Sequence, residues 1–494
     1  MTPGSTGLVL EEPLLCELSR PGRQSCSLPH ANDVPTRAPE ATLPAALLRQ
    51  TPAALPEISE ADLVRHFTRL SSWNYCKDAG FFPLGSCTMK HNPRTNEAVA
   101  ALPGFAYLHP YQDSGTAQGA LALIAALEEA LKAISGMEAI STCPAAGSHG
   151  ELTGLMVIRA YLQDRGDPRS RVLIPDSAHG TNPASAAICG YRVTQIPSGP
   201  DGLLEPSTVA NAMSDDVAAI MVTNPNTLGI FERNIREICD IVHARGGLVY
   251  CDGANLNALM GIAQIGEMGV DVMHFNLHKT FTTPHGGGGP GAGPIGVRQP
   301  LAPYLPIPRV VKTAAGYGWD ASAPKSIGRI KAFYGNFGML VRAYTYIREM
   351  GAPGLRHASE YAVLNANYIR AQLTASYHLP YATPALHECV LTDKWQQPGG
   401  VKTLDIAKRL MDYGFHPPTI YFPLLVAGAM MIEPTETESK ESCDQFIAAM
   451  RAIAKEAQHT PATLTEAPHH TFRRRLDEVM AARSPILTWH QLKG

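Results

Sequence analysis

The 494-residue sequence lacks several features that define common classes of protein. No apolar run approaches about 18 residues, so we expect no membrane-spanning helix. The N-terminus has no basic segment followed by an apolar core, which argues against a secretory signal. Basic and acidic residues are nearly balanced, 41 against 44, without a basic stripe. Nucleic acid and anionic membranes are therefore not expected as partners.

Paired cysteines and nucleotide-binding loops are missing as well. The ten cysteines are scattered without a CxxC pair, which is typical of reduced thiols in a cytoplasmic protein. We therefore expect neither disulfides nor a metal site. No GxxxxGK[ST] motif is present, and the GGGGPG run at 286–291 only partly fits a dinucleotide loop. Pro290 and Pro294 exclude the helix that would have to follow such a loop.

The composition changes twice along the chain, which predicts three parts. Residues 1–60 hold nine of the 40 prolines without periodicity and are expected to form an extended arm, with disorder as the alternative. Residues 61–350 are expected to form a large cofactor-binding α/β domain. Residues 351–494, which are richer in helical patterns, are expected to form a smaller α+β domain. Charged residues make up only 17% of the chain, which favours extensive burial, including burial in an oligomer.

The middle of the chain alternates short apolar strands with amphipathic helices. Strands are predicted at 171–175, 216–223, 248–251 and 270–277, and helices at 59–70, 117–134, 151–162 and 231–242. Further strands are predicted at 387–391 and 424–432. This alternation indicates a mostly parallel sheet with helices on both faces. Ligands of such sheets bind beyond the carboxyl ends of the strands.

Asp252 and Lys279 are the main candidates for chemistry. Asp252 ends a predicted strand, and Lys279 follows another strand 27 residues later, just before a glycine-rich run. A lysine that can form a Schiff base and an aspartate that can pair with a pyridinium nitrogen are what pyridoxal phosphate requires. Each residue alone has a plainer interpretation, because lysines near glycines usually lie in surface loops and an aspartate after a strand usually caps a helix.

A turn of small residues, Pro144–Gly150, precedes a predicted helix and is a candidate phosphate site. Backbone N–H groups at a helix start carry partial positive charge. Gly147 and Ser148 would hold the phosphate there, and His149 could stack on the pyridine ring. The alternative is an ordinary helix cap provided by Ser148.

Three further polar segments are candidates for contact with a cofactor or substrate. His179 lies in a polar cluster at a strand end, and Thr223 ends another strand, where it could bond a ring hydroxyl. Structural turns are the alternative for both residues. The segment 81–91 could be an active-site lid or a simple loop, and its polar residues are Ser86, Thr88, Lys90 and His91.

The joint order of phosphate turn, aspartate and lysine is typical of fold-type-I pyridoxal enzymes. The segments PLGSCTMK, AAGSHGE, SAHGTNPASA, CDGANLNALMG, HFNLHKTFTTPHGGGGPG and MIEPTETESK resemble the glycine dehydrogenase (decarboxylating) family, the P-proteins of the glycine cleavage system. The resemblance covers nearly all of the chain from about residue 10. It is strongest to the second subunit of the two-subunit bacterial type. One departure is His149, where single-chain members carry glutamine.

This resemblance implies a reaction, a cofactor and partners. Glycine would be decarboxylated with pyridoxal 5′-phosphate, and its aminomethyl group passed to the lipoyl arm of the H-protein. A partner subunit 1, an α2β2 heterotetramer and a cytoplasmic location are also implied. Lys279, Asp252 and His149 would be catalytic. The cofactor-binding residues would be Lys279, Asp252, Gly147, Ser148, His149, Thr223, Ala254 and His278.

Three other functions are weighed against this one. An aminotransferase usually needs an arginine for a second carboxylate, for which Arg329 and Arg342 are available. A cysteine desulfurase needs a mobile catalytic cysteine, and no cysteine here has suitable flanks. A catalytically empty scaffold subunit would be expected to lack the lysine, whereas this chain has both Lys279 and Asp252.

Overall fold

The computed structural model describes residues 12–26, 33–51, 53–285, 291–471, 473–488 and 491. The chain divides into two units. Residues 77–466 form what we call the large unit, and residues 1–76 with 467–494 form the terminal unit. The boundaries expected from the sequence at residues 60 and 350 stay a prediction. Most of the glycine run, 286–290, lies outside the described residues.

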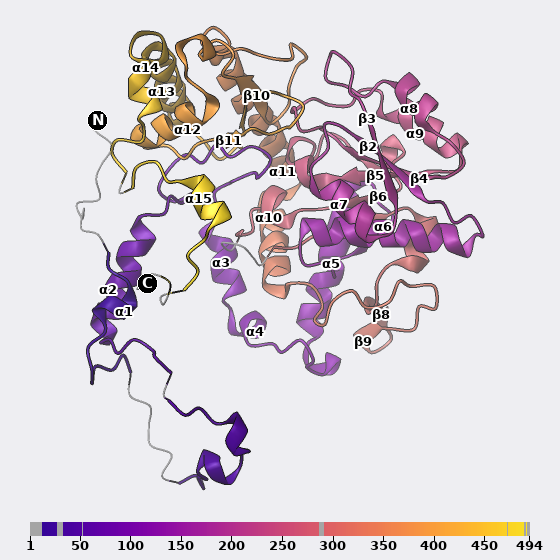
Figure 1. Ribbon diagram of the computed structural model, residues 1–494. Helices are drawn as coiled ribbons and strands as arrows, with labels where there is room; N and C mark the ends of the chain where they lie inside the picture. Colours follow the sequence, from indigo (N-terminus) through magenta and orange to yellow (C-terminus); the bar gives the residue numbers. More distant parts are fainter. Residues whose placement is uncertain are drawn as a thin grey trace. The chain divides into compact units, whose positions relative to one another are not determined.

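One seven-stranded sheet is the centre of the large unit (Figure 1). Its strands follow the order β1-β7-β6-β5-β4-β2-β3, and only β7 runs antiparallel to its neighbours. The strands are β1 (Ala139–Ser141), β2 (Arg171–Pro175), β3 (Arg192–Ile196), β4 (Val217–Thr223), β5 (Leu248–Asp252), β6 (Val272–His274) and β7 (Ile295–Val297). The mostly parallel sheet expected from the sequence is confirmed.

Helices cover both faces of this sheet because side chains alternate along its strands. On β4, Ile220 packs into one core with α5 (Gln118–Ser135), α9 (Ile235–Ala244) and part of α11 (Phe337–Leu373). The next residue, Met221, packs into the other core, whose helices are α6 (Gly147–Asp164) and α7 (Thr181–Ile188). Figure 1 shows α9 and the short α8 (Pro206–Ala212) across the strands from α6 and α7.

Some element boundaries differ from those expected. The strand before Lys279 ends at His274, and Leu277–Thr280 form a single helical turn, α10. The helix α6 begins at Gly147 rather than at Glu151, so the small-residue turn supplies its first turn. Glycine and serine are weak helix formers, which is why the periodicity of the apolar residues did not reveal this start.

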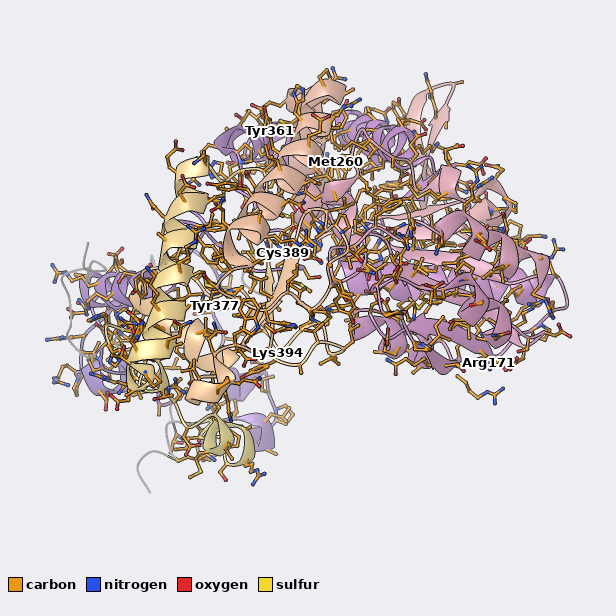
Figure 2. All side chains as sticks on the ribbon, turned by 90° about the horizontal axis from the view of Figure 1, so that it is seen from above. Arg171, Met260, Tyr361, Tyr377, Cys389 and Lys394 are labelled. Atoms are coloured by element: carbon orange, nitrogen blue, oxygen red, sulfur yellow. The ribbon has the colours of Figure 1, made fainter. Side chains whose placement is uncertain are left out.

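A second layer of the large unit contains a three-stranded antiparallel sheet. Its strands are β10 (Cys389–Thr392), β11 (Thr419–Ile420) and β12 (Ala429–Ile432), in the order β10-β12-β11. They pack against the second half of α11 and against α12 (Thr403–Asp412), α13 (Lys440–His459) and α14 (Pro461–Thr465). Tyr377 and Cys389 are buried in this layer (Figure 2). The smaller α+β part of the fold is therefore confirmed.

A kink divides α11, the longest helix of the chain. Gly351 has a φ of 60° there, which a residue with a side chain rarely adopts. Its buried residues up to Ala358 pack in the core beside the seven-stranded sheet, and Ile369 and Leu373 near its end pack in the core of the small sheet. The kinked helix therefore joins the two layers, and the small sheet can face the strand ends of the large one.

The terminal unit consists of short helices and extended chain. Its elements are α1 (Leu15–Leu18), α2 (Glu60–Ser72), α15 (Glu478–Arg483) and two 3-10 turns at Pro39–Ala41 and Ala45–Leu47. Its N-terminal arm is attached to α2, because Glu12 pairs with both His66 and Arg69. Within the described ranges, no helix of the chain is both long and apolar enough to cross a membrane. All ten cysteines are free thiols.

Candidate active site

Asp252 and Thr223 lie side by side at the carboxyl ends of two neighbouring strands. The register of β4 and β5 pairs these two residues directly. Asp252 is 2% exposed and Thr223 is 6% exposed. The Thr223 hydroxyl has no hydrogen-bond partner among the described residues, which is costly for a buried polar group. A buried hydroxyl without a partner at a strand end indicates that a ligand completes its bonding.

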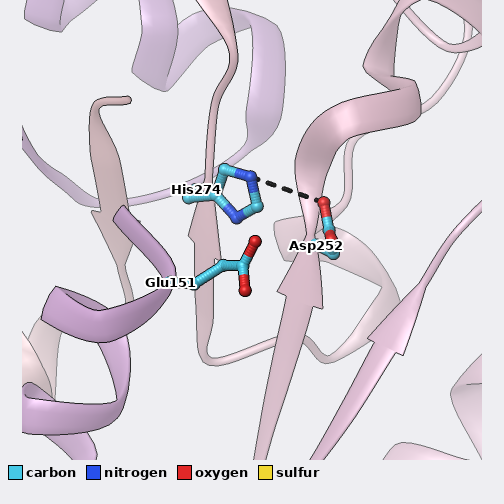
Figure 3. Close-up of side chains that lie close together, drawn as sticks. All are labelled: Glu151, Asp252 and His274. Carbon is cyan, nitrogen blue, oxygen red and sulfur yellow. Dashed lines mark ion pairs between the residues drawn. The ribbon is translucent and has the colours of Figure 1, made fainter. Parts of the chain in front are cut away.

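The carboxylate of Asp252 is held ionised. Its Oδ1 accepts a hydrogen bond of 2.9 Å from the Ala254 N–H, and its Oδ2 accepts one of 3.2 Å from Asn182. The His274 Nε2 atom lies 3.4 Å from Oδ1 (Figure 3). Burial raises the pKa of Asp252, but the His274 ring, the Lys279 ammonium and the two hydrogen bonds together lower it below its usual range. A negative charge is therefore available at this strand end.

A second buried carboxyl, Glu151, lies beside Asp252 (Figure 3). It accepts hydrogen bonds from Thr181 at 2.8 Å, Asn182 at 3.0 Å and Ser185 at 3.3 Å. Burial and the neighbouring charge of Asp252 raise the pKa of Glu151 to about 7. Asp252 therefore carries the negative charge, whereas Glu151 readily takes up a proton.

His274 fixes the geometry between these carboxyls and α10. Its Nδ1 lies 2.7 Å from the Tyr250 hydroxyl, and its Nε2 lies 2.9 Å from the Asn276 side-chain amide. Burial lowers the pKa of His274, and the negative charge of Asp252 opposes that fall. The backbone carbonyl of His274 also lies close to Gly253, where an added Cβ would approach it to 1.9 Å. Only glycine fits at position 253, directly after Asp252.

Lys279 lies on α10, three residues beyond the Asn276 that contacts His274. Its backbone N–H donates to the Asn276 carbonyl at 3.0 Å, and its side chain is half-buried. Among the described residues, no hydrogen bond or ion pair is made by the Lys279 Nζ atom. Its positive charge nevertheless lowers the pKa of Asp252, which places the two groups in one electrostatic site. The charge of Lys279 therefore acts on Asp252, while its amine is uncommitted among the described residues.

The start of α6 provides backbone N–H groups without a side-chain cap. The N-cap residue is Ala146, which makes no capping bond, and Ser148 is exposed inside the first turn. Ser148 is therefore not the helix cap. An added Cβ at Gly147 would lie 2.1 Å from the Asn276 Oδ1 atom, so only glycine lets the helix start approach α10 this closely. Uncapped N–H groups at a helix start favour an anion.

The histidines expected at the site are held neutral. Burial lowers the pKa of His149, whose Nδ1 accepts a hydrogen bond of 3.2 Å from the Ala145 N–H. Burial lowers the pKa of His278 to about 3, and its ring lies edge-on to His285 at 5.3 Å. His179 lies 2.8 Å from Thr181, which bonds Glu151, so it joins the hydrogen-bond network of the buried carboxyls. Neutral rings can stack on a pyridine ring without opposing a protonated nitrogen.

The segment 81–91 is anchored to α10 through Lys90. The buried Lys90 ammonium donates to the Thr280 carbonyl and to Asn257, both at 2.9 Å, and pairs with Glu436. Lys90 is therefore a structural cation next to Lys279. His91, in contrast, exposes its side chain and donates its backbone N–H to Thr437 at 3.1 Å.

This set of residues fits pyridoxal phosphate. The uncapped helix start suits its phosphate, the ionised Asp252 suits its ring nitrogen, and the unpaired Thr223 hydroxyl suits its ring hydroxyl. Lys279 has an amine without a partner that can react with its carbonyl carbon. Arg342, in contrast, is bound by Glu97 through two hydrogen bonds of 2.7 and 2.8 Å, so it is not free to bind a second substrate carboxylate.

Sequence reasoning missed several residues of the site. Glu151, Asn182 and His274 lie within the quoted segments, but nothing in their spacing assigns them to Asp252. His387, Glu388 and Glu433, which flank strands of the small sheet, were missed as well. The only signal available was a polar residue within or next to an apolar stretch, and such residues often serve structure.

Comparison with known proteins places the chain among close relatives. The glycine dehydrogenase C-terminal domain model matches residues 358–474, and the aminotransferase class-V model matches residues 152–288. The probable glycine dehydrogenase (decarboxylating) subunit 2 of Oceanobacillus iheyensis is 55% identical over 97% of this chain and 99% of its own length. That of Alkaliphilus oremlandii is 56% identical over 97% and 98%. A crystal structure of an inhibitor-bound glycine decarboxylase (P-protein) of the glycine cleavage system shares the fold, with a TM-score of 0.71 and 20% identity over 84% of this chain and 94% of that one.

Proposed function

The chain belongs to the glycine dehydrogenase (decarboxylating) subunit 2 family, and from that premise we propose that the site around Lys279 binds pyridoxal phosphate and decarboxylates glycine. The observation that carries this assignment is an uncommitted lysine amine beside an ionised, buried aspartate at the strand ends. The fold-type-I architecture and the cofactor agree with both matching family models.

Each residue has a proposed role in holding the cofactor. The Gly147 and Ser148 N–H groups bind the phosphate, and His149 covers the ring. Thr223 bonds the ring hydroxyl, and Asp252 keeps the ring nitrogen protonated. Ala254 orients Asp252 through its N–H, whose hydrogen bond to the carboxylate is 2.9 Å long.

Lys279 and its neighbour His278 complete the proposed site. Lys279 would hold the cofactor through its amine, which can react with a carbonyl carbon. His278 packs beside that amine as a neutral ring. When bound, pyridoxal phosphate supplies an electron sink for the pair of electrons left behind as carbon dioxide departs. The negative charge of Asp252 maintains that sink, because it stabilises the proton on the ring nitrogen.

We further propose that the aminomethyl group passes to a lipoylated H-protein and that the chain works with a partner subunit 1 in an α2β2 heterotetramer. The relatives are named as second subunits, which supports a partner chain. The exposed apolar residues of the terminal unit support a large protein interface. Ten free cysteines support a cytoplasmic location, where thiols stay reduced.

Reduction with borohydride tests the assignment directly. Mass spectrometry of the reduced protein is expected to find a pyridoxyl adduct on Lys279. Lys279→Ala should abolish the adduct, whereas Lys312→Ala, at an exposed lysine of the large unit, should leave it in place. Exchange of labelled carbon dioxide into glycine should accompany the adduct, and transamination should not. An adduct on another lysine, or transamination without exchange, would refute the proposal.

A further inference from the structure

A buried lysine, Lys90, connects the elements around Lys279. Its side chain is 1% exposed and belongs to the segment 81–91. The three N–H groups of its ammonium meet four acceptors from four parts of the large unit. These acceptors are the Asn257 Oδ1 atom at 2.9 Å in η4 (Gly253–Ala258), the Thr280 carbonyl at 2.9 Å in α10, the Tyr346 hydroxyl at 3.2 Å in α11 and the Glu436 carboxylate at 2.5 Å after β12. Lys90 therefore links α10 to both layers of the large unit.

The ammonium of Lys90 keeps its charge in this position. Burial lowers the pKa of Lys90, but the Glu436 carboxylate and the Tyr346 hydroxyl outweigh burial and raise it above its ordinary value. The Thr280 carbonyl is the last one of the short helix α10, and the last carbonyls of a helix have no partner within the helix. Lys90 supplies that partner, so the backbone directly after Lys279 is bound by a fixed cation.

Two asparagines that follow Lys90 hold the next residues of the same turn. The Asn92 side-chain amide donates to the Thr282 carbonyl, and the Asn96 side-chain amide donates to the Thr282 hydroxyl at 3.0 Å. Asn96 is fully buried. We call Lys90, Asn92 and Asn96 the anchoring residues, because all three bind the turn 280–282 that follows Lys279.

The backbone that the anchoring residues hold is strained. Thr282 has a φ of 55°, which is uncommon for any residue with a side chain and an outlier for a β-branched one. Five non-glycine residues in the described ranges have such a positive φ, namely Ser86, Thr88, Thr282, Tyr421 and Thr435. All except one of them lie within four residues of Lys90, Lys279 or Glu436. Strained backbone persists only where surrounding contacts over-determine it, and it is typical of functional sites.

We propose that Lys90 is a positioning residue for the chemistry of Lys279. Its ammonium, with the amides of Asn92 and Asn96, fixes the turn 280–282 and thereby the direction from which the Lys279 amine reaches the carbonyl carbon of the cofactor. Such positioning matters because a misplacement of about 1 Å can cost about a hundredfold in rate. This inference rests on the proposed role of Lys279.

A plainer role for Lys90 is to neutralise the buried carboxylate of Glu436. The two side chains are 1% and 9% exposed, so either charge would destabilise the fold if it lost its partner. The two roles can be separated because they depend on different acceptors. Neutralisation needs only the ion pair with Glu436, whereas positioning needs the bond to the Thr280 carbonyl.

Amide hydrogen exchange tests the positioning role without the cofactor. The apoenzyme, assembled with its partner subunit, is compared with a double variant that carries Lys90→Met and Glu436→Gln. The double variant removes both charges, so neither is left unpaired, but the Thr280 carbonyl loses its donor. Exchange in the peptide that covers residues 275–283 should become at least about tenfold faster. The rest of the large unit should exchange as in the wild type.

Trapping of the cofactor with borohydride measures the effect on Lys279 itself. In the double variant, the rate at which pyridoxal phosphate forms the adduct on Lys279 should fall about a hundredfold. Asn96→Leu should lower this rate about tenfold, since it removes the bond to the Thr282 hydroxyl. Asn96→Leu leaves no charge unpaired, and the Asn96 Oδ1 atom that it removes has no hydrogen-bond partner in the described structure.

Leu410→Ala is the control for a general loss of stability. Leu410 is fully buried in the core of the small sheet, so the variant should unfold at a lower temperature than the wild type. Its exchange at 275–283 and its rate of cofactor uptake should nevertheless stay within about threefold of the wild-type values. Circular dichroism checks that each variant is folded.

The possible outcomes are distinct. If Lys90 only neutralises Glu436, the double variant takes up the cofactor and exchanges at 275–283 like the wild type, which would overturn the inference. Equal losses of uptake in Leu410→Ala and the double variant would overturn it too, because uptake would then follow overall stability. If the double variant does not fold, wild-type uptake in Asn96→Leu is the result that overturns the inference.

Failure of the proposed function would be recognised separately. Absence of an adduct on Lys279 in the wild type would refute that function. The exchange at 275–283 would still decide whether Lys90 fixes the turn after Lys279, because it is measured without the cofactor.

Discussion

The two units of this chain differ in what they bury. In the large unit, two apolar cores enclose the sheet, and a third lies around the small sheet. In the terminal unit, the only apolar residues buried among those described are Ile58, Ala467 and Pro468. Yet, among the described residues, each unit exposes thirteen large apolar side chains, although the terminal unit is about a quarter as long. Those of the terminal unit are Leu14, Val34, Leu43, Leu47, Leu55, Val64, Phe67, Trp73, Leu476, Val479, Met480, Ile486 and Leu487.

This difference indicates that the two units serve different functions. The large unit buries its apolar side chains and leaves polar atoms, such as the Thr223 hydroxyl, without partners at the strand ends. In the described part of the terminal unit, the buried Glu12 is paired with both His66 and Arg69, and most apolar side chains are exposed. Unpaired buried polar atoms are completed by a ligand, and a dense set of exposed apolar side chains is completed by another protein. The proposed function therefore places the chemistry in the large unit, and we expect the terminal unit to contact the proposed partner subunit.

Asp252→Asn should abolish chemistry while leaving assembly intact. We expect the exchange of carbon dioxide into glycine to fall roughly a thousandfold, because a neutral amide cannot hold the proton on the ring nitrogen. Sedimentation of the complex with the partner subunit should not change. Glu151→Gln is the matched control, since Glu151 readily takes a proton beside Asp252, and it should retain at least about a tenth of the rate. Near-normal exchange in Asp252→Asn would show that Asp252 is not needed for the reaction.

Charged substitutions in the terminal unit should have the opposite effect. Val479 and Met480 on α15 are each about 60% exposed, and replacing both by aspartate places two charges in the expected interface. The affinity for the partner subunit should fall at least about a hundredfold by analytical ultracentrifugation. Borohydride trapping on Lys279 should persist.

Leu364→Asp, at an equally exposed position on α11 of the large unit, is the control for that experiment. It should leave the affinity for the partner within about threefold of the wild-type value. If the substitution at Leu364 disrupts the complex and the pair on α15 does not, the assignment of assembly to the terminal unit is wrong.

The sequence predicted the sheet and its cofactor motif better than the surroundings of the motif. Short apolar runs correctly located β2, β4 and β5, because strands buried on both faces are almost continuously apolar. Asp252 could be named because it ends a predicted strand, and Lys279 could be named because a glycine-rich run follows it. Both signals are local in the sequence. The closeness of Glu433 to Glu388 could not be predicted, since it depends on the pairing of β10 with β12.

The start of α6 shows a second limit of sequence reasoning. Ser148 was as good a cap candidate as a phosphate ligand, because serine favours both positions. The structure excludes the cap, because Ala146 is the N-cap residue, and the phosphate role stays a prediction. The close approach of Gly147 to Asn276 shows where this helix start lies. A contact between residues 129 positions apart cannot be read from local propensity.

A substitution in the core of the large unit should change the dependence of its stability on pH. Glu232 is 3% exposed, and burial raises its pKa to about 7, above the ordinary value of 4.5. The folded state then holds the proton more tightly than the unfolded state. Glu232 therefore contributes stability that is fully present below pH 4.5 and is lost as the pH rises through 7.

Glu232→Gln removes this titration. From pH 4.5 to 8, the free energy of unfolding of the variant should gain up to about 3 kcal/mol relative to that of the wild type. Chemical denaturation at successive pH values measures the difference. Lys312→Ala, at an exposed position, should show no such change. A constant difference across this range would mean that the Glu232 carboxyl is not protonated in the folded state.

The smallest effect, and the sharpest test of the unpaired polar atoms, is expected for Thr223→Val. Valine keeps the shape of threonine and removes a hydroxyl that has no partner, so the apoenzyme should gain up to about 1 kcal/mol in stability. The affinity for pyridoxal phosphate should fall about tenfold, since the hydroxyl bonds only the ligand.

Thr403→Val removes an equally buried hydroxyl that donates to the Gly428 carbonyl at 2.7 Å, and it should show the reverse pattern. Its apoenzyme should lose about 1–3 kcal/mol while its affinity stays unchanged. Thermal denaturation of both apoenzymes and cofactor titration distinguish the two cases. If Thr223→Val destabilises the apoenzyme and leaves the affinity unchanged, this hydroxyl stabilises the fold. The proposed contact of Thr223 with the cofactor would then be wrong.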